Sequence, residues 1–384
     1  MATTFLDIHV IQSVPPSNVN RDETGAPKSA VYGGVRRARV SSQAWKRATR
    51  EAFKSFVDES KLGVRTQRII EKIAAKIKEV DGSLESEAEG IAERVLNAVG
   101  IKLEKPKKKS KDSEDDDDTR TESAYLVFFS DQQITKAAEQ AVNDHREGKT
   151  KFDKKSYAPI LKADNSIDIA LFGRMIADLT DLGVDASAQV AHALSVHAVE
   201  PEADFYTAVD DYKVNDPERD AGAGMLGTVE FNSSTLYRYA TVNVDQLEQN
   251  LGSKDAAREA LLAFARAFVL SMPTGKMNTF GNSTVPAAVI YSVRSDRPIS
   301  FAEAFEDPLV REDGFVRAAV NGLVGYATDI DTTYTPAVGY WTSGVGSKTE
   351  RLDELATRAS VDEASQAAVS AAMDAVAVSS KADK

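Results

Sequence analysis

The segment from residue 18 to residue 56, here called the basic segment, constrains the fold of this 384-residue chain more than any other stretch. Between Thr24 and Arg50 it carries seven basic residues and no acidic one, although the chain has a formal net charge of −12. The seven are Lys28, Arg36, Arg37, Arg39, Lys46, Arg47 and Arg50. Positive charge gathered into one stretch of an acidic chain indicates a polyanionic ligand.

The basic segment also has the pattern of a strand that leads directly into a helix. VRRARVS alternates, which would place Val35, Arg37 and Arg39 on one face of a strand. Ser41 or Ser42 can then cap a helix. Its apolar stripe is expected from residues three or four apart: Trp45, Ala48, Ala52 and Phe56.

Two features that bind anions therefore meet in the basic segment. One is the start of the helix, with free N–H groups and the positive end of the helix dipole. The other is the group of Lys and Arg side chains. A nucleic-acid backbone would use both. The alternative from composition alone is a solvated basic helix face, which is common in proteins of other functions.

The composition predicts a protein that stays in the cytoplasm. A hydrophobic content of 42% supplies a sizeable core, in one large domain with insertions or in two domains. The absence of cysteine excludes disulfides and cysteine metal sites and fits a reducing compartment. MATTFLDIHV has no basic stretch before its apolar residues, so it does not resemble a signal peptide. The most apolar helix contains Arg258, Glu259 and Arg266, and no membrane segment is expected.

The remaining pattern alternates between strands and helices. Strands are expected at residues 4–14, ended by Pro15 and Pro16, and at 167–173, 190–200, 235–243, 285–294 and 338–342. Helices are expected within 65–99 as a hairpin and at 131–148, 254–271, around 301–305 and at 315–326. This order predicts an α+β sheet with helices on one face and a large helical insertion.

Three patterns are judged not to form sites. Residues 104–122 hold a block of lysines followed by acids and are expected to be a disordered insertion, with Asp115–Asp118 a solvated run. His192 and His197 are five residues apart, a spacing that suits packing or hydrogen bonding better than a shared metal. Gly222, Gly224 and Gly227 match G-x-G-x-x-G by accident, since a dinucleotide site needs a preceding strand and a following helix. No metal or cofactor is expected.

Longer stretches of the sequence resemble a known family. NRDETGAPKSAVYGG followed by RRARVSSQAWKRA resembles the N-terminal signature of the CasC family, the backbone subunit of the type I-E CRISPR Cascade complex. The resemblance continues in the same order through DIALFGRM, HAVEPEADFYTAVDD and LGTVEFNSSTLYRYATVNVDQL.

The resemblance implies an RNA-recognition-motif-like (ferredoxin-like) palm, a helical fingers insertion and a β-hairpin thumb. The palm would comprise residues 1–60, 186–200 and 229–384, the last with the C-terminal helices; the fingers 61–185, and the thumb 201–228. No strand carries the aromatic motif with which such domains stack RNA bases, so the palm is not expected to bind RNA through its sheet face.

The function that the resemblance implies is non-catalytic. Copies of the chain would assemble head to tail along the CRISPR RNA, contact the other Cascade subunits and present the guide to the target DNA strand in antiviral defence. The main alternative is a metal-dependent ribonuclease of the type III backbone-subunit kind that uses Asp22, although an ion pair with the neighbouring Arg21 explains that residue more simply. A scaffold that binds only proteins is a third possibility, disfavoured by the basic segment.

The resemblance also assigns RNA-binding residues by position. Those of the basic segment are Asn20, Arg21, Lys28, Ser41, Ser42, Gln43, Lys46, Arg47 and Arg50. Arg174 and Met175 match a place at which the methionine touches the bases, and Lys276 lies in a loop of uncertain role. Phe205, Tyr206 and Thr207 match the thumb tract that wedges into the heteroduplex. Because a fully apolar ring gains most from burial, we expect Phe205 to pack at the thumb's base and Tyr206 to meet a base.

Overall fold

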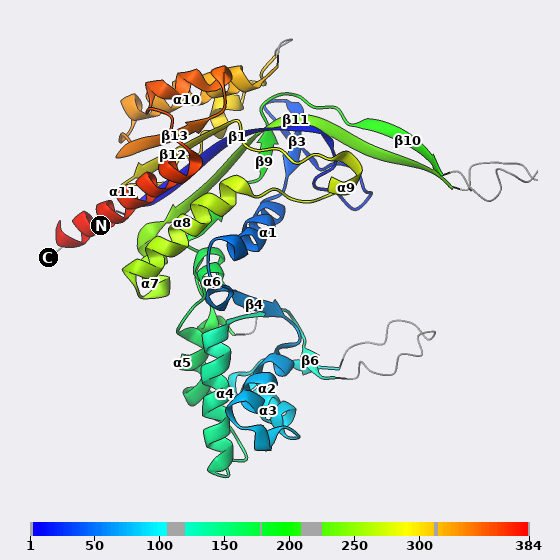
Figure 1. Ribbon diagram of the computed structural model, residues 1–384, viewed down its shortest axis with the longest axis vertical. Coiled ribbons are helices and arrows are strands. Elements are labelled where there is room, and N and C mark those ends of the chain that lie inside the picture. The colour runs from blue at the N-terminus through cyan, green and yellow to red at the C-terminus, as the bar shows by residue number, and fades with distance from the viewer. Residues whose placement is uncertain (1–2, 106–119, 177–178, 209–224, 311–313, 383–384) are drawn as a thin grey trace, which may run out of the picture. The chain divides into compact units, whose positions relative to one another are not determined.

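The protein, described here by a computed structural model, is a mixed α+β chain (Figure 1). The structure describes residues 3–105, 120–176, 179–208, 225–310 and 314–382. It divides into two compact units, the first made of residues 1–56, 189–244 and 261–384 and the second of residues 57–188 and 245–260. The expected fingers insertion, residues 61–185, falls within the second unit, which also takes in residues 245–260.

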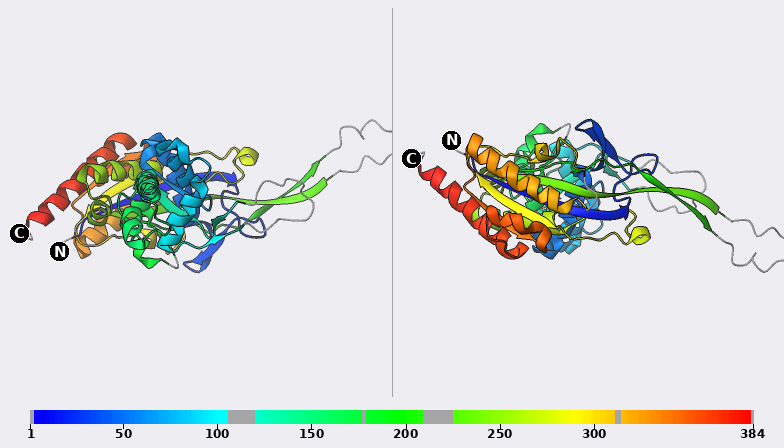
Figure 2. Two further views of the ribbon diagram at one scale, coloured as in Figure 1. Left: turned by 90° about the horizontal axis from the view of Figure 1, so that it is seen from below. Right: turned by 90° about the horizontal axis from the view of Figure 1, so that it is seen from above.

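A nine-stranded sheet forms the centre of the first unit. Its strands are β1 (Phe5–Ser17), β2 (Ser29–Tyr32), β3 (Val35–Val40), β8 (Ala188–Val190), β9 (Ala193–Ser195), β10 (Glu202–Ala208), β11 (Met225–Asn243), β12 (Ala288–Arg294) and β13 (Gly339–Gly344). They lie in the order β13-β12-β1-β11-β9-β3-β2, with β8 and β10 each paired to β11. The long pair β10–β11 extends away from the rest of this sheet as a two-stranded ribbon (Figure 2).

Strand β1 is an interior strand of the sheet, and it is buried on both faces. Residues 6–12 are all buried, and Ile8 pairs with Ala240 of β11 on one side and Tyr291 of β12 on the other. The prediction that Pro15 and Pro16 end this strand was wrong. Pairing resumes at Ser17 after a register shift, which accommodates two residues that have no N–H for the ladder.

Helices cover both faces of the sheet, so the prediction of helices on one face only was wrong. The helices of this unit are α1 (Ser42–Ala52), η1 (Phe53–Ser55), α9 (Met277–Phe280), η6 (Ala302–Phe305), α10 (Val316–Thr333), η7 (Ser347–Glu354), α11 (Val361–Ala382) and α8 (Lys254–Leu270) from Leu261 onward. Figure 1 shows α10 on one side of the sheet and α8 and α11 on the other.

Successive residues of β11 show why both faces need a cover. Tyr237 and Tyr239 pack into a core cluster with Phe301 and the α10 residue Leu323. Arg238 between them points the opposite way, toward α1 and α8. Because neighbouring side chains of a strand point to opposite faces, a strand without exposed positions needs a layer on each side.

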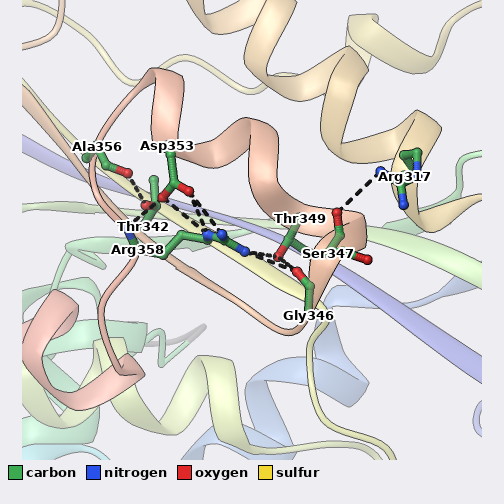
Figure 3. Close-up of polar contacts among 8 residues, drawn as sticks. All are labelled: Arg317, Thr342, Gly346, Ser347, Thr349, Asp353, Ala356 and Arg358. Atoms are coloured by element: carbon green, nitrogen blue, oxygen red, sulfur yellow. Dashed lines mark hydrogen bonds and ion pairs between the residues drawn. The ribbon is translucent and has the colours of Figure 1, made fainter.

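The edge strand β13 is secured by the chain that follows it. Arg358 forms ion-paired hydrogen bonds to Asp353 and donates to the carbonyl of Gly346 at 3.0 Å (Figure 3). Thr342 of β13 donates its hydroxyl to the carbonyl of Ala356 at 2.8 Å. These bonds hold η7 and the loop that follows it against β13.

The second unit is mainly helical. Its elements are η2 (Glu59–Lys61), β4 (Gly63–Thr66), α2 (Ile69–Val80), η3 (Gly82–Leu84), α3 (Ala88–Val99), β5 (Leu103–Glu104), β6 (Glu122–Ser123), β7 (Val127–Ser130), α4 (Asp131–Arg146), α5 (Lys154–Lys162), α6 (Ile167–Phe172), η4 (Thr180–Leu182) and α7 (Val244–Leu251). The expected helical hairpin is confirmed as α2 and α3. The helix from Asp131 is also confirmed, with a capping box between Ser130 and Gln133.

The strand expected at residues 167–173 is instead the helix α6, so that prediction was wrong. Residues 167–171 are all buried, and a short apolar run that is buried all round has no period that separates strand from helix. The helix α7 was not anticipated. The insertion expected to be disordered has its centre, residues 106–119, outside the described residues, while Glu104 and Glu122 pair in β5 and β6. Among the described helices, none has the length and apolar content needed to cross a membrane.

Candidate nucleic-acid interface

The loop that precedes β2 is tied directly to the start of α1. Asn20 accepts a hydrogen bond from the backbone N–H of Ser41 at its side-chain oxygen (2.8 Å), and its carbonyl accepts from the N–H of Lys28 (2.9 Å). The backbone of Arg21 forms an isolated antiparallel β-bridge with that of Pro27 across the loop, and Arg21 is exposed. Three of the sequence-predicted residues, Asn20, Lys28 and Ser41, therefore lie together.

Asp22 is committed to the fold of this same loop. Its carboxylate accepts from the hydroxyl of Thr24 (2.7 Å), the N–H of Thr24 (2.9 Å) and the N–H of Ala26 (3.0 Å). The Thr24 side chain and these backbone bonds hold the pKa of Asp22 below its usual value. The expected ion pair with Arg21 is thus replaced by a local cap. Over the described part of the chain, no three His, Asp or Glu side chains form a group that could hold a metal.

The predicted strand and helix of the basic segment are confirmed as β3 and α1. Ser41 is the N-cap, and its hydroxyl accepts from the N–H of Ala44 at 3.3 Å. The buried positions are Trp45, Thr49 and Phe53, so the apolar stripe differs from the expected one. The expected stripe joined Trp45 to Ala48, but the helix buries every fourth residue and continues as η1.

The cationic side chains of α1 differ in their surroundings. Arg47 is exposed, whereas Lys46 and Arg50 are half-buried. Partial burial lowers the pKa of Lys46 from its usual value. A half-buried cationic side chain suits phosphate contact, because its stem is restrained before any ligand arrives.

The amide groups at the start of α1 were expected to be free, but two of them are hydrogen-bonded. The N–H of Ser42 donates to Nδ1 of His192 at 3.2 Å, and that of Ala44 is taken by Ser41. Ser42 is half-buried and Gln43 is exposed beside it. A histidine that the sequence assigned to packing or hydrogen bonding therefore stands at the helix start, and that assignment is confirmed.

One of the seven basic residues is structural. Arg37 is completely buried and donates to four backbone carbonyls, those of Tyr32 (3.1 Å), Ser195 (3.0 Å), Phe305 (2.8 Å) and Glu306 (3.1 Å). It ties the β2–β3 hairpin to η6. The hairpin turn itself needs Gly33, which has φ +58° and whose Cβ would stand 1.7 Å from the Glu306 carbonyl oxygen.

A buried arginine of β11 also packs against α1. The guanidinium of Arg238 lies 3.8 Å from the ring centroid of Trp45 and donates to Gln12 at 2.6 Å. Burial lowers its pKa to about 9. Arg238 therefore fixes the helix that carries Lys46 and Arg50, and sequence reasoning had placed it only as an alternating strand residue.

Lys276 belongs to a loop that packs against the basic segment. It has a left-handed backbone, with φ +52°, and it precedes the short helix α9. Its neighbour Gly275 approaches the chain so closely that a Cβ there would stand 2.3 Å from the Val19 carbonyl oxygen. The structure thus brings the Lys276 loop beside the start of the basic segment.

The thumb residues lie on the ribbon of β10 and β11, and the β-hairpin pairing is present in the described residues. Phe205 faces Thr228 and Tyr206 faces Gly227 in the register. Phe205 is 64% exposed, so the prediction that it packs at the thumb's base was wrong. Tyr206 is 39% exposed and its ring lies over Gly227, within 2.8 Å of where a Cβ would be. Thr207 is exposed, and residues 209–224 lie outside the described residues.

Arg174 and Met175 belong to the second unit and have opposite surroundings. Arg174 is buried and donates to the carbonyls of Leu182 (2.8 Å) and Leu161 (2.8 Å). Burial lowers its pKa to about 10. Its assignment to direct RNA contact is corrected to a structural role, because its guanidinium faces the protein. Met175 is 91% exposed, and the bonds of Arg174 hold the turn that displays it.

Comparison with known proteins gives the family of the chain. The family model described as CT1975-like protein matches residues 6–371 of the chain. This chain belongs to the CT1975-like family.

Two solved structures are similar to this CT1975-like chain over nearly its whole length. A chain of one described as "CRISPR RNA-guided surveillance complex, pre-nicking" is 37% identical, with a TM-score of 0.81, covering 96% of this chain and 100% of that one. A chain of one described as "CRISPR RNA-guided surveillance complex" is 34% identical, with a TM-score of 0.71, covering 96% and 99%. No curated protein matches the sequence.

Proposed function

We propose that this CT1975-like chain is a non-catalytic subunit that binds CRISPR RNA in a type I-E surveillance complex in the cytoplasm. It grips the guide backbone and presents the bases for pairing with a target DNA strand in antiviral defence. The observation that carries the proposal is the basic segment, in which Lys28 is tied through Asn20 to the N-cap of α1 and that helix carries Lys46 and Arg47. The segment belongs to a chain that is similar over 96% of its length to a surveillance-complex chain.

The sheet order supports a palm of the RNA-recognition-motif type. Strands β12, β1, β11 and β9 lie side by side, and in chain order they are the fourth, first, third and second of this set. Helix α1 follows the first of them and α8 follows the third, as in a ferredoxin-like arrangement. The opposite face, where such domains stack bases, is covered by η6 and α10. RNA binding is therefore assigned to the end and edge of the sheet.

Assembly along the guide is the second part of the proposal. A head-to-tail contact repeats without closing into a ring, which suits a linear RNA and places the same basic segment at regular intervals. The thumb is proposed to reach the heteroduplex with Phe205 and Tyr206, since both rings are exposed and a ring stacks on any base. Contacts with the other subunits of the complex belong to the same proposal.

Co-purification tests this proposal. The chain is expressed with its neighbouring subunits and a guide-encoding array, the complex is isolated, and its RNA is extracted and sized. The expected result is short RNA of one uniform length. Recovery of the intact complex without RNA, or with RNA of random lengths, would contradict the proposal.

The ribonuclease alternative is examined with the same complex. Target RNA is added with magnesium or manganese, for the wild type and for Asp22→Ala. Because the Asp22 carboxylate is occupied by Thr24 and Ala26, we expect no cleavage by either protein. Metal-dependent cleavage that is lost in Asp22→Ala would establish the enzyme instead.

A further inference from the structure

His192 lies where β3, β9 and the start of α1 meet. Val40, the last residue of β3, pairs with Ala193, the first of β9, and His192 immediately precedes that pair. The N–H of Ser42 then reaches Nδ1 of His192 at 3.2 Å. The imidazole is exposed, although its Nδ1 side is turned to the protein.

This hydrogen bond determines which ring nitrogen of His192 carries hydrogen. A nitrogen that accepts from a backbone N–H has no hydrogen of its own, so the neutral imidazole carries its hydrogen on Nε2. Partial desolvation, with Arg39 and Lys28 nearby, lowers the pKa of His192 and favours this neutral form. The His192 side chain is therefore a donor whose direction is fixed by its hydrogen bond from the Ser42 N–H at the start of α1.

Two cationic side chains, those of Arg39 and Lys28, lie near His192. The N–H of Arg39 in β3 donates to the carbonyl of Lys28 at 2.9 Å, which holds Lys28, the residue just before β2, beside Arg39. The guanidinium of Arg39 is positioned by a bond from Nε to the carbonyl of Ser29 (3.1 Å). A neutral donor of fixed direction with two cations nearby suits an oxyanion, because the cations supply attraction and the donor supplies direction.

We propose that His192 is a further RNA-contacting residue, which donates from Nε2 to a phosphate oxygen of the guide backbone bound between Lys28 and Arg39. The inference rests on the proposed function and adds to it a residue from outside the basic segment. The Ser42 N–H that would otherwise face the phosphate donates to Nδ1 of His192. The Nε2 hydrogen of the imidazole then takes the place of that amide as the donor to the phosphate.

Three variants in the assembled complex separate this role from a structural one. His192→Asn keeps an acceptor near the position of Nδ1 for Ser42 but has no donor at the position of Nε2. His192→Gln places an amide N–H near that outer position. His192→Ala removes both, and its thermal stability reports what the Ser42 bond contributes.

The measurement is the affinity of the complex for its guide RNA, together with its thermal stability. We expect His192→Asn to bind the guide about tenfold more weakly at near wild-type stability, because a hydrogen bond to a charged group is lost. His192→Gln should recover most of the affinity. Wild-type affinity in His192→Asn, or a His192→Gln protein that binds no better than His192→Asn, overturns the inference and leaves the proposed function standing. A wild-type complex that retains no guide RNA overturns both.

Discussion

The basic segment and the thumb are both assigned to RNA, but they are built in opposite ways. In the basic segment Asn20 joins the loop to the start of α1, and Arg37 and His192 join the segment to distant parts of the chain. In the thumb, β10 pairs with β11, and both aromatic rings are exposed. A substitution in the basic segment can therefore disturb folding and binding together, whereas one in the thumb should affect mainly what the thumb touches.

The largest expected effect concerns Arg37 and its neighbour Arg36. Arg37→Ala should lower the free energy of unfolding by about 3 kcal/mol or more, because four buried carbonyls lose a charged donor. Arg36→Ala removes the same charge from an exposed side chain that lies 3.9 Å from Glu200. It should change the free energy of unfolding by less than about 0.5 kcal/mol. Chemical denaturation measures both. Equal losses would show that burial does not distinguish these arginines.

A second prediction concerns the sheet beneath the basic segment. Asp7 is buried, accepts from the hydroxyl of Tyr239 (3.0 Å) and the N–H of Ile299 (3.0 Å), and burial raises its pKa to about 6. Since the native state holds the proton more tightly than the unfolded chain, this residue stabilises the fold most at low pH. That contribution is lost as the pH rises from 3.8 to about 6.

Comparison with Asp7→Asn isolates this contribution. One pKa unit corresponds to about 1.4 kcal/mol, so the unfolding free energy of the wild type should fall relative to Asp7→Asn by about 3 kcal/mol across this range. Denaturation at a series of pH values gives the difference. A difference that stays constant between pH 4 and pH 7 would mean that Asp7 is not held protonated by burial.

The smallest stability effects are expected in the thumb. Phe205→Ala should change the unfolding free energy by less than about 0.5 kcal/mol, because its ring is exposed. Tyr206→Ala should cost about 1 kcal/mol, since its ring covers Gly227 on the paired strand. A loss of several kcal/mol in Phe205→Ala would indicate that this ring is buried against the protein after all.

The proposed wedge is tested on the assembled complex by chemical probing of the guide bases. A repeating pattern of reactivity is expected in the wild type, altered in Phe205→Ala or Tyr206→Ala while the guide stays bound. Uniform reactivity in the wild type would contradict the proposal that Phe205 and Tyr206 wedge into the heteroduplex.

Much of the fold could be predicted from local patterns. The alternation of VRRARVS and the serine cap defined β3 and α1, and the apolar periods defined α2, α3 and α4. The helix α6 could not be predicted, because its residues 167–171 are all buried and carry no period. The second helical layer over the sheet was missed because its evidence is the burial of both faces of β1 and β11, which depends on tertiary packing.

The candidate site was predictable by residue type and less so by role. Sequence indicated that charge gathers near Lys46, but Arg37 and Arg174 proved to be buried donors to carbonyls. Nothing local separates a buried arginine from an exposed one on an alternating strand. The contact between His192 and Ser42 joins residues 150 positions apart, and only the pairing of β3 with β9 reveals it.

The most direct test of the account measures how salt changes the affinity for guide RNAs of several sequences. Wild type is compared with Lys46→Ala/Arg50→Ala and, as a control, with Lys348→Ala/Arg351→Ala, which loses the same charge from η7 of the same unit. If the chain grips the backbone, the first variant should weaken binding alike for every sequence and lower the slope of log affinity against log salt by about 0.7 per lost contact. The control should match the wild type. A loss that depends on guide sequence with an unchanged slope, or an equal loss in the control, would contradict the account.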